Sequence, residues 1–399
     1  MVRGDKMTKV NNRATIFWAI ASILVVILLV KYPEQAFQAA LEGLRVWWEV
    51  VFPALLPFFI VAEILMGVGV VNFVGVLLEP LMRPVFNIPG EGAFPLAMGL
   101  ASGYPLGARI TRGLYDKEDL TRTEAERLIC FCNTANPLFM IGAVSVGMFG
   151  TARIGTTLIF VHYVSAIILG FLLSFLEKRP KKTRQKSGRN TNIFVKAWQK
   201  MLEAKQRDGR TFGDILGDAV WVSVNSVLRV GGFIVFFAVL IRLFDLVGLS
   251  HLLATVLNLA LVPLFGEGLA RPLIGGFFEV TTGCQLAAAS SATFVWKIAI
   301  TNAIIAWSGL SVFGQVKSMI KGTDIRQGLF IKSRVIHAVL AFLITPLSLI
   351  LFPLTMPVWT GATTSVGNIA LFVIVLVFGL ILSLIIDTIQ KAKITWLRW

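Results

Sequence analysis

The sequence predicts an all-α polytopic membrane protein with about eight transmembrane helices and two re-entrant helical hairpins in an inverted repeat. Of its 399 residues, 56% are hydrophobic and only 15% are charged, a balance that no soluble globule has. Several apolar runs reach the roughly 20 residues that a helix needs to cross a bilayer. Two similar glycine-broken segments interrupt these runs, an arrangement typical of transporters whose site lies between repeats.

The two glycine-broken segments resemble each other along their length. The first begins at Gly90 and reads GEGAFPLAMGLASGYPLGA, and the second begins at Gly266 and reads GEGLARPLIGGFFEVTTGCQLAA. GYPLGA at 103–108 corresponds to GCQLAA at 283–288. A helix break leaves backbone polar groups unpaired, and such breaks survive in a membrane only where protein or a wet cavity surrounds them. Each segment is therefore predicted to be a re-entrant hairpin whose tip lies near the middle of the membrane.

Basic residues are placed as membrane topology requires. Residues 177–212 carry twelve basic side chains against three acidic ones, and a second basic stretch runs from Lys317 to Arg334. Loops rich in Lys and Arg stay in the cytoplasm, so both stretches are predicted to be cytoplasmic. The net charge of +15 is then explained by topology and by contact with anionic membrane lipids, and we expect no nucleic-acid partner.

With these loops inside, the whole chain can be threaded through the membrane. The predicted crossings are 14–31, 47–69, 128–149, 154–176, 220–245, 294–316, 335–354 and 368–389. Segments 71–82 and 249–265 are predicted to lie at the inner and the outer surface, and both termini are predicted to be cytoplasmic. An odd number of crossings then separates the hairpins, so the repeats are inverted; if 249–265 crosses instead, the repeats become parallel.

This threading divides the chain into five parts. In order, they are an N-terminal cytoplasmic segment with the first transmembrane helix and a connection (1–45), the first repeat (46–176), the basic cytoplasmic loop (177–212), the second repeat (213–355), and the last transmembrane helix with a cytoplasmic tail (356–399).

Polar residues gather at the predicted tips and in the helices that follow them. Glycine and proline account for chain reversal, whereas the nearby polar side chains are not needed for it. The candidate substrate-binding residues are Ser102, Gly103 and Tyr104 at the first tip; Glu279, Thr281, Thr282, Gly283 and Gln285 at the second; and Asn133, Thr134, Asn136, Asn302 and Ser308 in the helices that follow. The alternative is that they only satisfy exposed backbone groups.

Two features single out particular candidates. Pro137 cannot donate a helical hydrogen bond, so it opens the backbone beside Asn133 and Asn136. Glu279 is a charged residue in an apolar zone, directly before a tip, which makes it a candidate for coupling transport to a proton.

The sequence predicts no metal site, no cofactor and no catalytic centre. Its few cysteines and histidines lie too far apart, or on different helix faces, to form a ligand set. These residues are Cys130, Cys132, Cys284, His162, His251 and His337. Because no nucleophile is paired with a base, the chain is not expected to be an enzyme.

The motif SGYPLGA and the run Asn133-Thr134-Ala135-Asn136-Pro137 resemble the YlbJ (SpoVV) family of sporulation integral membrane proteins from endospore-forming bacteria. The resemblance covers about residues 14–390. The repeats at 46–176 and 213–355 are similar to the nucleoside-recognition or Gate domain, which is also half of a concentrative nucleoside transporter. The resemblance implies a protein of the outer forespore membrane that moves dipicolinic acid during sporulation. The tips depart from those of sodium-coupled nucleoside transporters, so neither nucleoside recognition nor sodium coupling is carried over.

The first functional hypothesis is therefore a transporter of a small organic anion, with dipicolinate as the implied substrate. Dipicolinate is a planar aromatic dianion, and the N-terminus of the half-helix after each tip favours a carboxylate. Two opposed half-helices are predicted to hold its two carboxylates, with Tyr104 stacked on the ring. The alternatives are a nucleoside or other small-solute carrier and a non-transporting membrane scaffold for spore maturation. The oligomeric state is left open.

Overall fold

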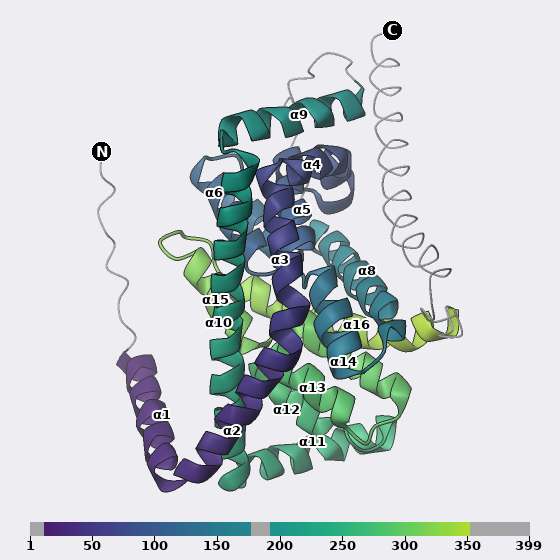
Figure 1. Ribbon diagram of the computed structural model, residues 1–399. Coiled ribbons are helices and arrows are strands. Elements are labelled where there is room, and N and C mark those ends of the chain that lie inside the picture. The colour runs from purple at the N-terminus through teal and green to yellow at the C-terminus, as the bar shows by residue number, and fades with distance from the viewer. Residues whose placement is uncertain (1–11, 177–191, 352–399) are drawn as a thin grey trace.

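The computed structural model describes residues 12–176 and 192–351, and this part of the chain is helical and contains no strand (Figure 1). Its helices long and apolar enough to cross a membrane are Pro33–Gly67, Ala152–Ser174, Phe212–Leu246, Phe294–Met319 and Gly328–Ile350. Val70–Phe86 and Gly90–Ser102 add a pair bent by 114°, which is a broken span or a re-entrant loop. The predicted all-α polytopic membrane fold is confirmed. The count of eight crossings stays a prediction, and the last of them, 368–389, lies outside the described residues.

The helices form two sets, one before and one after residues 177–191. The first set comprises α1 (Asn12–Lys31), α2 (Pro33–Val46), η1 (Trp47–Val51), α3 (Phe52–Gly67), α4 (Val70–Leu81), η2 (Met82–Phe86), η3 (Gly90–Gly92), α5 (Ala93–Ser102), α6 (Leu106–Asp116), α7 (Arg122–Cys132), η4 (Phe139–Met148), η5 (Ala152–Ile154) and α8 (Gly155–Ser174). The second set comprises α9 (Ile193–Asp208), α10 (Phe212–Leu246), α11 (Leu249–Phe265), α12 (Ala270–Phe278), α13 (Val280–Ala289), α14 (Phe294–Trp307), α15 (Gly309–Met319) and α16 (Gly328–Leu351).

The predicted connection before residue 46 is instead a helix. α2 runs through the π-helical turn η1 into α3, which makes one helix of 35 residues. The first part, α2, was not predicted because its polar residues interrupt the apolar run. It is an amphipathic helix that packs against α10 through Ala36, Ala39 and Gly43. A Cβ added at Gly43 would lie 3.0 Å from the Cβ of Ala238, so the glycine permits the close approach of the two helices.

Part of the predicted basic loop is also helical. α9 covers Ile193–Asp208 and packs on α4, where Ala197 is buried and Lys196 pairs with Glu79. The prediction of a plain loop is therefore wrong for these residues. Residues 177–191 of the loop lie outside the described chain.

A helical hairpin is present at both predicted places; that the hairpins are re-entrant stays a prediction. α5 and α6 pack together and reverse direction between Gly103 and Pro105, whereas α12 and α13 reverse at Glu279. Figure 1 shows α4, α5 and α6 toward one end of the bundle and α11, α12 and α13 toward the other. α11, predicted to lie at the outer surface, runs across that second end at a steep angle to α10. An inverted repeat requires the two hairpins to lie toward opposite ends of the bundle. The inversion itself stays a prediction.

Each half also contains a helix that breaks midway. α7 ends at Cys132, residues 133–136 are not helical, and η4 begins at Phe139, which confirms the predicted break before Pro137. In the second half α14 gives way to α15 at Ser308 and Gly309, whose φ angles are 72° and 78°.

The second basic stretch, Lys317 to Arg334, contacts α7 just before the predicted crossing 128–149. Arg326, in the loop before α16, donates from Nε and a terminal nitrogen to the carboxylate of Glu126 on α7, at 3.0 and 3.2 Å. Burial opposes ionisation of Glu126, but the hydrogen bonds from Arg326 and Arg122 outweigh it and hold the pKa of this carboxyl below its ordinary value. Glu126 and Arg326 lie just before the predicted crossings 128–149 and 335–354, and their contact agrees with placing the starts of both crossings on the same side of the membrane.

Arg334, predicted to end the second cytoplasmic basic stretch, is fully buried on α16. One terminal nitrogen donates to the carbonyl of Asn133 at 3.0 Å and to that of Ala306 at 3.4 Å, and the other donates to the carbonyl of Cys130. These carbonyls lie where α7 and α14 end. Helix C-termini carry partial negative charge, so one guanidinium stabilises the broken helices of both halves.

The first prediction concerns topology. α10 is long enough, about 50 Å, to separate exposed Gln206 before it from exposed Val247 after it. Cysteines placed singly at these positions should react with a membrane-impermeant maleimide from opposite sides of sealed vesicles. The parent, whose three native cysteines are buried, serves as the blank. Labelling of both positions from one side would contradict both a spanning α10 and the inverted repeat.

The second prediction concerns Arg334. Arg334→Met removes charged donors from the three carbonyls, and each hydrogen bond to a charged group contributes about 1.5–3 kcal/mol. We expect the free energy of unfolding in detergent to fall by about 3 kcal/mol or more. Lys332→Met, at an exposed position on the same helix, should change it by about 0.5 kcal/mol or less. Equal stability of the two variants would show that Arg334 does not stabilise the breaks.

Candidate functional site

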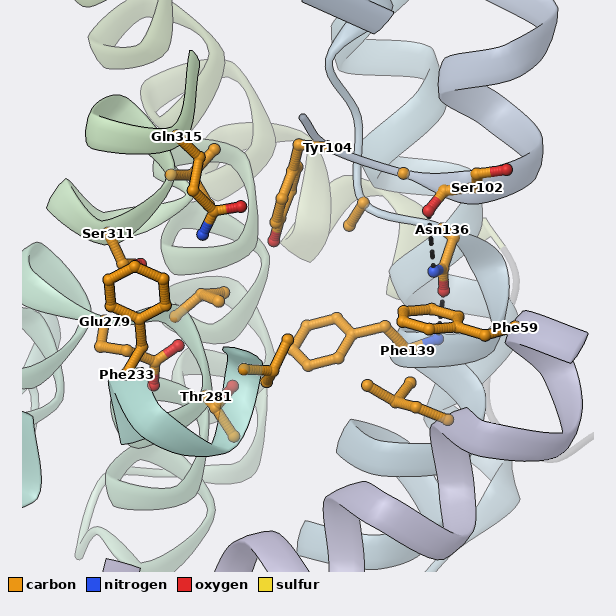
Figure 2. A pocket seen from close by; sticks show the side chains of 16 residues that line it. Phe59, Ser102, Tyr104, Asn136, Phe139, Phe233, Glu279, Thr281, Ser311 and Gln315 are labelled. Atoms are coloured by element: carbon orange, nitrogen blue, oxygen red, sulfur yellow. Dashed lines mark hydrogen bonds between the residues drawn. The ribbon is translucent and has the colours of Figure 1, made fainter. Parts of the chain in front are cut away.

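A cavity of about 80 Å³ lies where the two hairpin tips meet the first helix break (Figure 2). This volume accommodates several water molecules. It is lined by Leu55 and Phe59 of α3; Ser102, Gly103 and Tyr104 of the first tip; Ala135, Asn136 and Phe139 of the break; Val230 and Phe233 of α10; Glu279, Val280 and Thr281 of the second tip; and Ser311, Val312 and Gln315 of α15. Segments from both halves of the chain thus converge on one space.

The structure divides the predicted site residues into two groups. Those that line the cavity are Ser102, Gly103, Tyr104, Asn136, Glu279 and Thr281. Those that lie outside its lining are Asn133, Thr134, Thr282, Gly283, Gln285, Asn302 and Ser308. Both tips and the break therefore contribute to the cavity, but most polar residues of the broken helices do not.

The first tip is fixed to the helix break by side-chain amides. Gly103 has a φ of 81° and reverses the chain. Asn136 donates to the Ser102 carbonyl at 3.4 Å and accepts from the backbone N–H of Phe139 at 2.6 Å. The Ser102 hydroxyl points away from the cavity, toward the sulfur of Met66 at 3.6 Å (Figure 2). Ser102 therefore contributes its backbone to the cavity, and its hydroxyl does not face a ligand.

Asn133 and Thr134 bind the backbone of the same hairpin. The Asn133 side chain accepts from the backbone N–H of Ala108 at 3.0 Å and donates to the carbonyl of Ile129 at 2.7 Å. Thr134 donates to the carbonyl of Gly99 at 3.2 Å. These side chains satisfy backbone groups at the break, which is the alternative that the sequence left open for the polar residues of the tips.

Glu279 organises the second tip. Its side chain is 3% exposed, and one carboxylate oxygen accepts from the backbone N–H of Thr282 at 2.7 Å and from the Thr282 hydroxyl at 3.1 Å. Glu279 is thus the N-cap of α13. Thr282 serves as its partner, while the neighbouring Thr281 faces the cavity (Figure 2).

Internal acceptors occupy both half-helix N-termini, where the sequence predicts the substrate carboxylates. Glu279 caps α13, and Asn133 accepts from Ala108 in the first turn of α6. An anion in this cavity consequently meets the carboxylate of Glu279 before it meets the N-terminus of α13.

Gly103 and Gly283 do not have the equivalent roles that their matching repeat positions predict. A Cβ at Gly283 would lie 2.3 Å from the Cα of Gly276, so Gly283 permits close packing of α13 on α12. It does not line the cavity. Substitution of Gly283 would disturb the hairpin itself, whereas Gly103 lies at the cavity wall.

The remaining predicted residues lie away from the cavity. Gln285 is exposed. Asn302 donates to the Thr345 hydroxyl at 2.9 Å and links α14 to α16. Ser308 adopts the positive φ that separates α14 from α15.

Sequence reasoning missed several lining residues. Phe59 and Phe233 give the cavity aromatic walls, and Ser311 and Gln315 approach it from α15 (Figure 2). Ser311 and Gln315 are four residues apart and share one helix face, and that spacing of polar residues in an apolar helix was the available signal. The Tyr104 hydroxyl is buried and has no hydrogen-bond partner among the described residues; Figure 2 shows it directed toward the Gln315 side.

Two histidines also proved to be neighbours, although they are far apart in sequence. The rings of His162 on α8 and His337 on α16 have centroids 4.9 Å apart. His162 accepts from the backbone N–H of Ala135 at 3.0 Å, and a ring nitrogen of His337 lies 3.1 Å from the carbonyl of His162. His162 and Arg334 bind the first break directly and His337 contacts His162, and none of the three residues lines the cavity.

Comparison with known proteins agrees with this geometry. The Gate family model, described as nucleoside recognition, matches residues 48–152, which include the first hairpin and the first break; a Gate-like second repeat stays a prediction. The chain is 41% identical over 338 residues to the sporulation integral membrane protein YlbJ of Bacillus subtilis (strain 168), covering 84% of this chain and 82% of that protein. It is also 23% identical over 204 residues to an uncharacterised protein, BpOF4_10220, of Alkalihalophilus pseudofirmus, covering 49% and 42% of the two chains. The protein is therefore a transporter-like integral membrane protein that belongs to the YlbJ family of sporulation membrane proteins.

Proposed function

We propose that this protein carries a small organic anion, dipicolinic acid, across the outer forespore membrane during sporulation. The observation that carries the proposal is the cavity between two hairpin tips and a helix break. Broken helices that meet near the middle of the bundle are typical of carriers that open alternately to the two sides of a membrane. The family relationship to a sporulation membrane protein supports the cellular setting. The placement of both termini in the cytoplasm rests on the distribution of basic residues.

The lining suits a small aromatic acid. Phe59, Phe139 and Phe233 offer apolar ring faces, and aromatic pairs add to the burial of apolar area. Tyr104 and Gln315 offer hydrogen-bond donors on another side of the cavity. The volume of about 80 Å³ is far below the roughly 300 Å³ at which pockets for drug-sized ligands begin, so the tips have to separate to admit even a small substrate.

A neutral hydroxylated solute such as a nucleoside is the second candidate. The specific observation in its favour is Glu279, because a buried carboxylate accepts hydrogen bonds from hydroxyl groups more readily than it tolerates another anion. The match of residues 48–152 to a nucleoside-recognition model points the same way.

The third prediction tests transport and binding together. Liposomes that contain only this protein should accumulate labelled dipicolinate. Tyr104→Phe should weaken its binding roughly tenfold to a hundredfold, the value of about 1.5–3 kcal/mol for one hydrogen bond to a charged group. Its stability should not change, because the hydroxyl has no partner among the described residues.

Tyr163→Phe is the matched control. The Tyr163 hydroxyl donates to the carbonyl of Ala135 at 3.1 Å, so its loss should lower stability and leave affinity unchanged. Uptake of a nucleoside in place of dipicolinate would favour the second candidate. A folded protein that takes up neither solute would contradict a carrier function.

A further inference from the structure

Glu279 is the one formally charged side chain among the 16 residues that line the cavity. The carboxylate of Glu279 would repel an anionic substrate in this cavity. We propose that Glu279 takes up one proton when the anion binds and shares it with a substrate carboxylate, so that each anion crosses the membrane with one proton. This inference rests on the proposed function and adds its coupling ion.

In the empty cavity the hydrogen bonds of Glu279 stabilise its ionised form. The carboxylate accepts from the N–H and the hydroxyl of Thr282, and both donors strengthen when the acceptor is charged. It also caps the N-terminus of α13, where the helix dipole favours a negative charge. Burial of the side chain opposes ionisation, and these donors and the cap act against that effect. We infer that Glu279 is ionised in the empty cavity between pH 6 and pH 8.

The bound anion changes this balance. Glu279 lines the cavity between the tips, so a dianion bound there lies close to its carboxylate, and the two charges repel each other strongly in a site that the protein encloses. Two carboxylates that share such a site hold one proton between them, because both cannot remain ionised. The protonated group then donates a hydrogen bond to the other, and repulsion becomes attraction.

In the part of the chain that the structure describes, no neighbouring cation relieves the repulsion instead. Cys284 on α13 and Tyr104 of the first tip are the titratable groups that face Glu279. The cavity-lining residues of α3, α10, α15 and the first break include no titratable side chain. In residues 12–176 and 192–351, no lysine, arginine or histidine nitrogen lies within 4 Å of the Glu279 carboxylate. Arg334 does not line the cavity, and its terminal nitrogens donate to helix carbonyls.

The proton balance of the step is simple. One proton from water on the entry side joins the pair formed by Glu279 and a carboxylate of the dianion, and it returns to water when the anion leaves on the other side. The transported unit of a dianion and one proton then carries a single negative charge.

Binding of dipicolinate to the purified protein tests the inference. Between pH 6 and pH 8 the free anion stays fully ionised, because carboxyl groups ordinarily titrate near pH 4. Uptake of one proton should weaken the apparent affinity by about tenfold per pH unit as the pH rises. Calorimetry in two buffers of different ionisation enthalpy should count one proton taken up per anion bound.

Glu279→Gln keeps a hydrogen-bond donor at this position but cannot take up a proton. The amide can still cap α13 through its oxygen, so this variant should bind dipicolinate with an affinity independent of pH and without proton uptake. Glu267→Gln, at an exposed position beside the same hairpin, should keep the pH slope of the parent.

The outcomes separate the two proposals. Binding by the parent with no pH slope and no proton uptake would overturn proton sharing and leave the carrier proposal intact. Failure of the folded parent to bind dipicolinate at any pH would overturn the carrier proposal itself. If Glu279→Gln does not fold, the proton count for the parent alone decides.

Discussion

Every helix break inside a membrane protein exposes backbone groups that lipid cannot satisfy, and this constraint shapes the centre of the molecule. The first break is held by Arg334 through the carbonyls of Cys130 and Asn133, and by His162 through the N–H of Ala135. Arg334 also reaches the end of α14 at Ala306. Because one buried guanidinium serves both halves of the chain, the two breaks are fixed relative to each other, and a cavity can form between them.

The same constraint decides which polar residues remain for a ligand. Asn133 and Thr134 are occupied with the backbone of the first hairpin, and Thr282 with Glu279. Few polar side chains that line the cavity are left without such a partner. One of them is Tyr104, whose hydroxyl has no hydrogen-bond partner among the described residues. Glu279 caps α13 and also lines the cavity. Its carboxylate repels an anionic substrate there unless a proton accompanies the substrate, which connects the structure of the tips to the energetics of transport.

Glycine and proline made the main architecture predictable, because their backbone effects are local. The first tip and the break before Pro137 follow from these residues, whereas the second hairpin reverses at Glu279, four residues before Gly283, which packs α13 on α12. The membrane fold was predictable from the composition. Arg334 could not be recognised in the same way, because it lies next to Lys332 in a basic run and its partners lie on α7 and α14. Its signal was the polar face of α16, where Arg334, His337, Thr345 and Ser348 recur at helical spacing. α2 was missed for the opposite reason, since its polar residues concealed a helix whose small residues pack on α10.

The central claim is that substrate binds between the two tips, and protection of a cysteine in the cavity tests it most directly. Ser311 is buried in the cavity wall, whereas Ser318 is exposed on the same helix beyond it. Dipicolinate should slow alkylation of Ser311→Cys by a small thiol reagent and leave the rate for Ser318→Cys unchanged. Equal alkylation rates of Ser311→Cys with and without saturating dipicolinate would contradict a site between the hairpin tips.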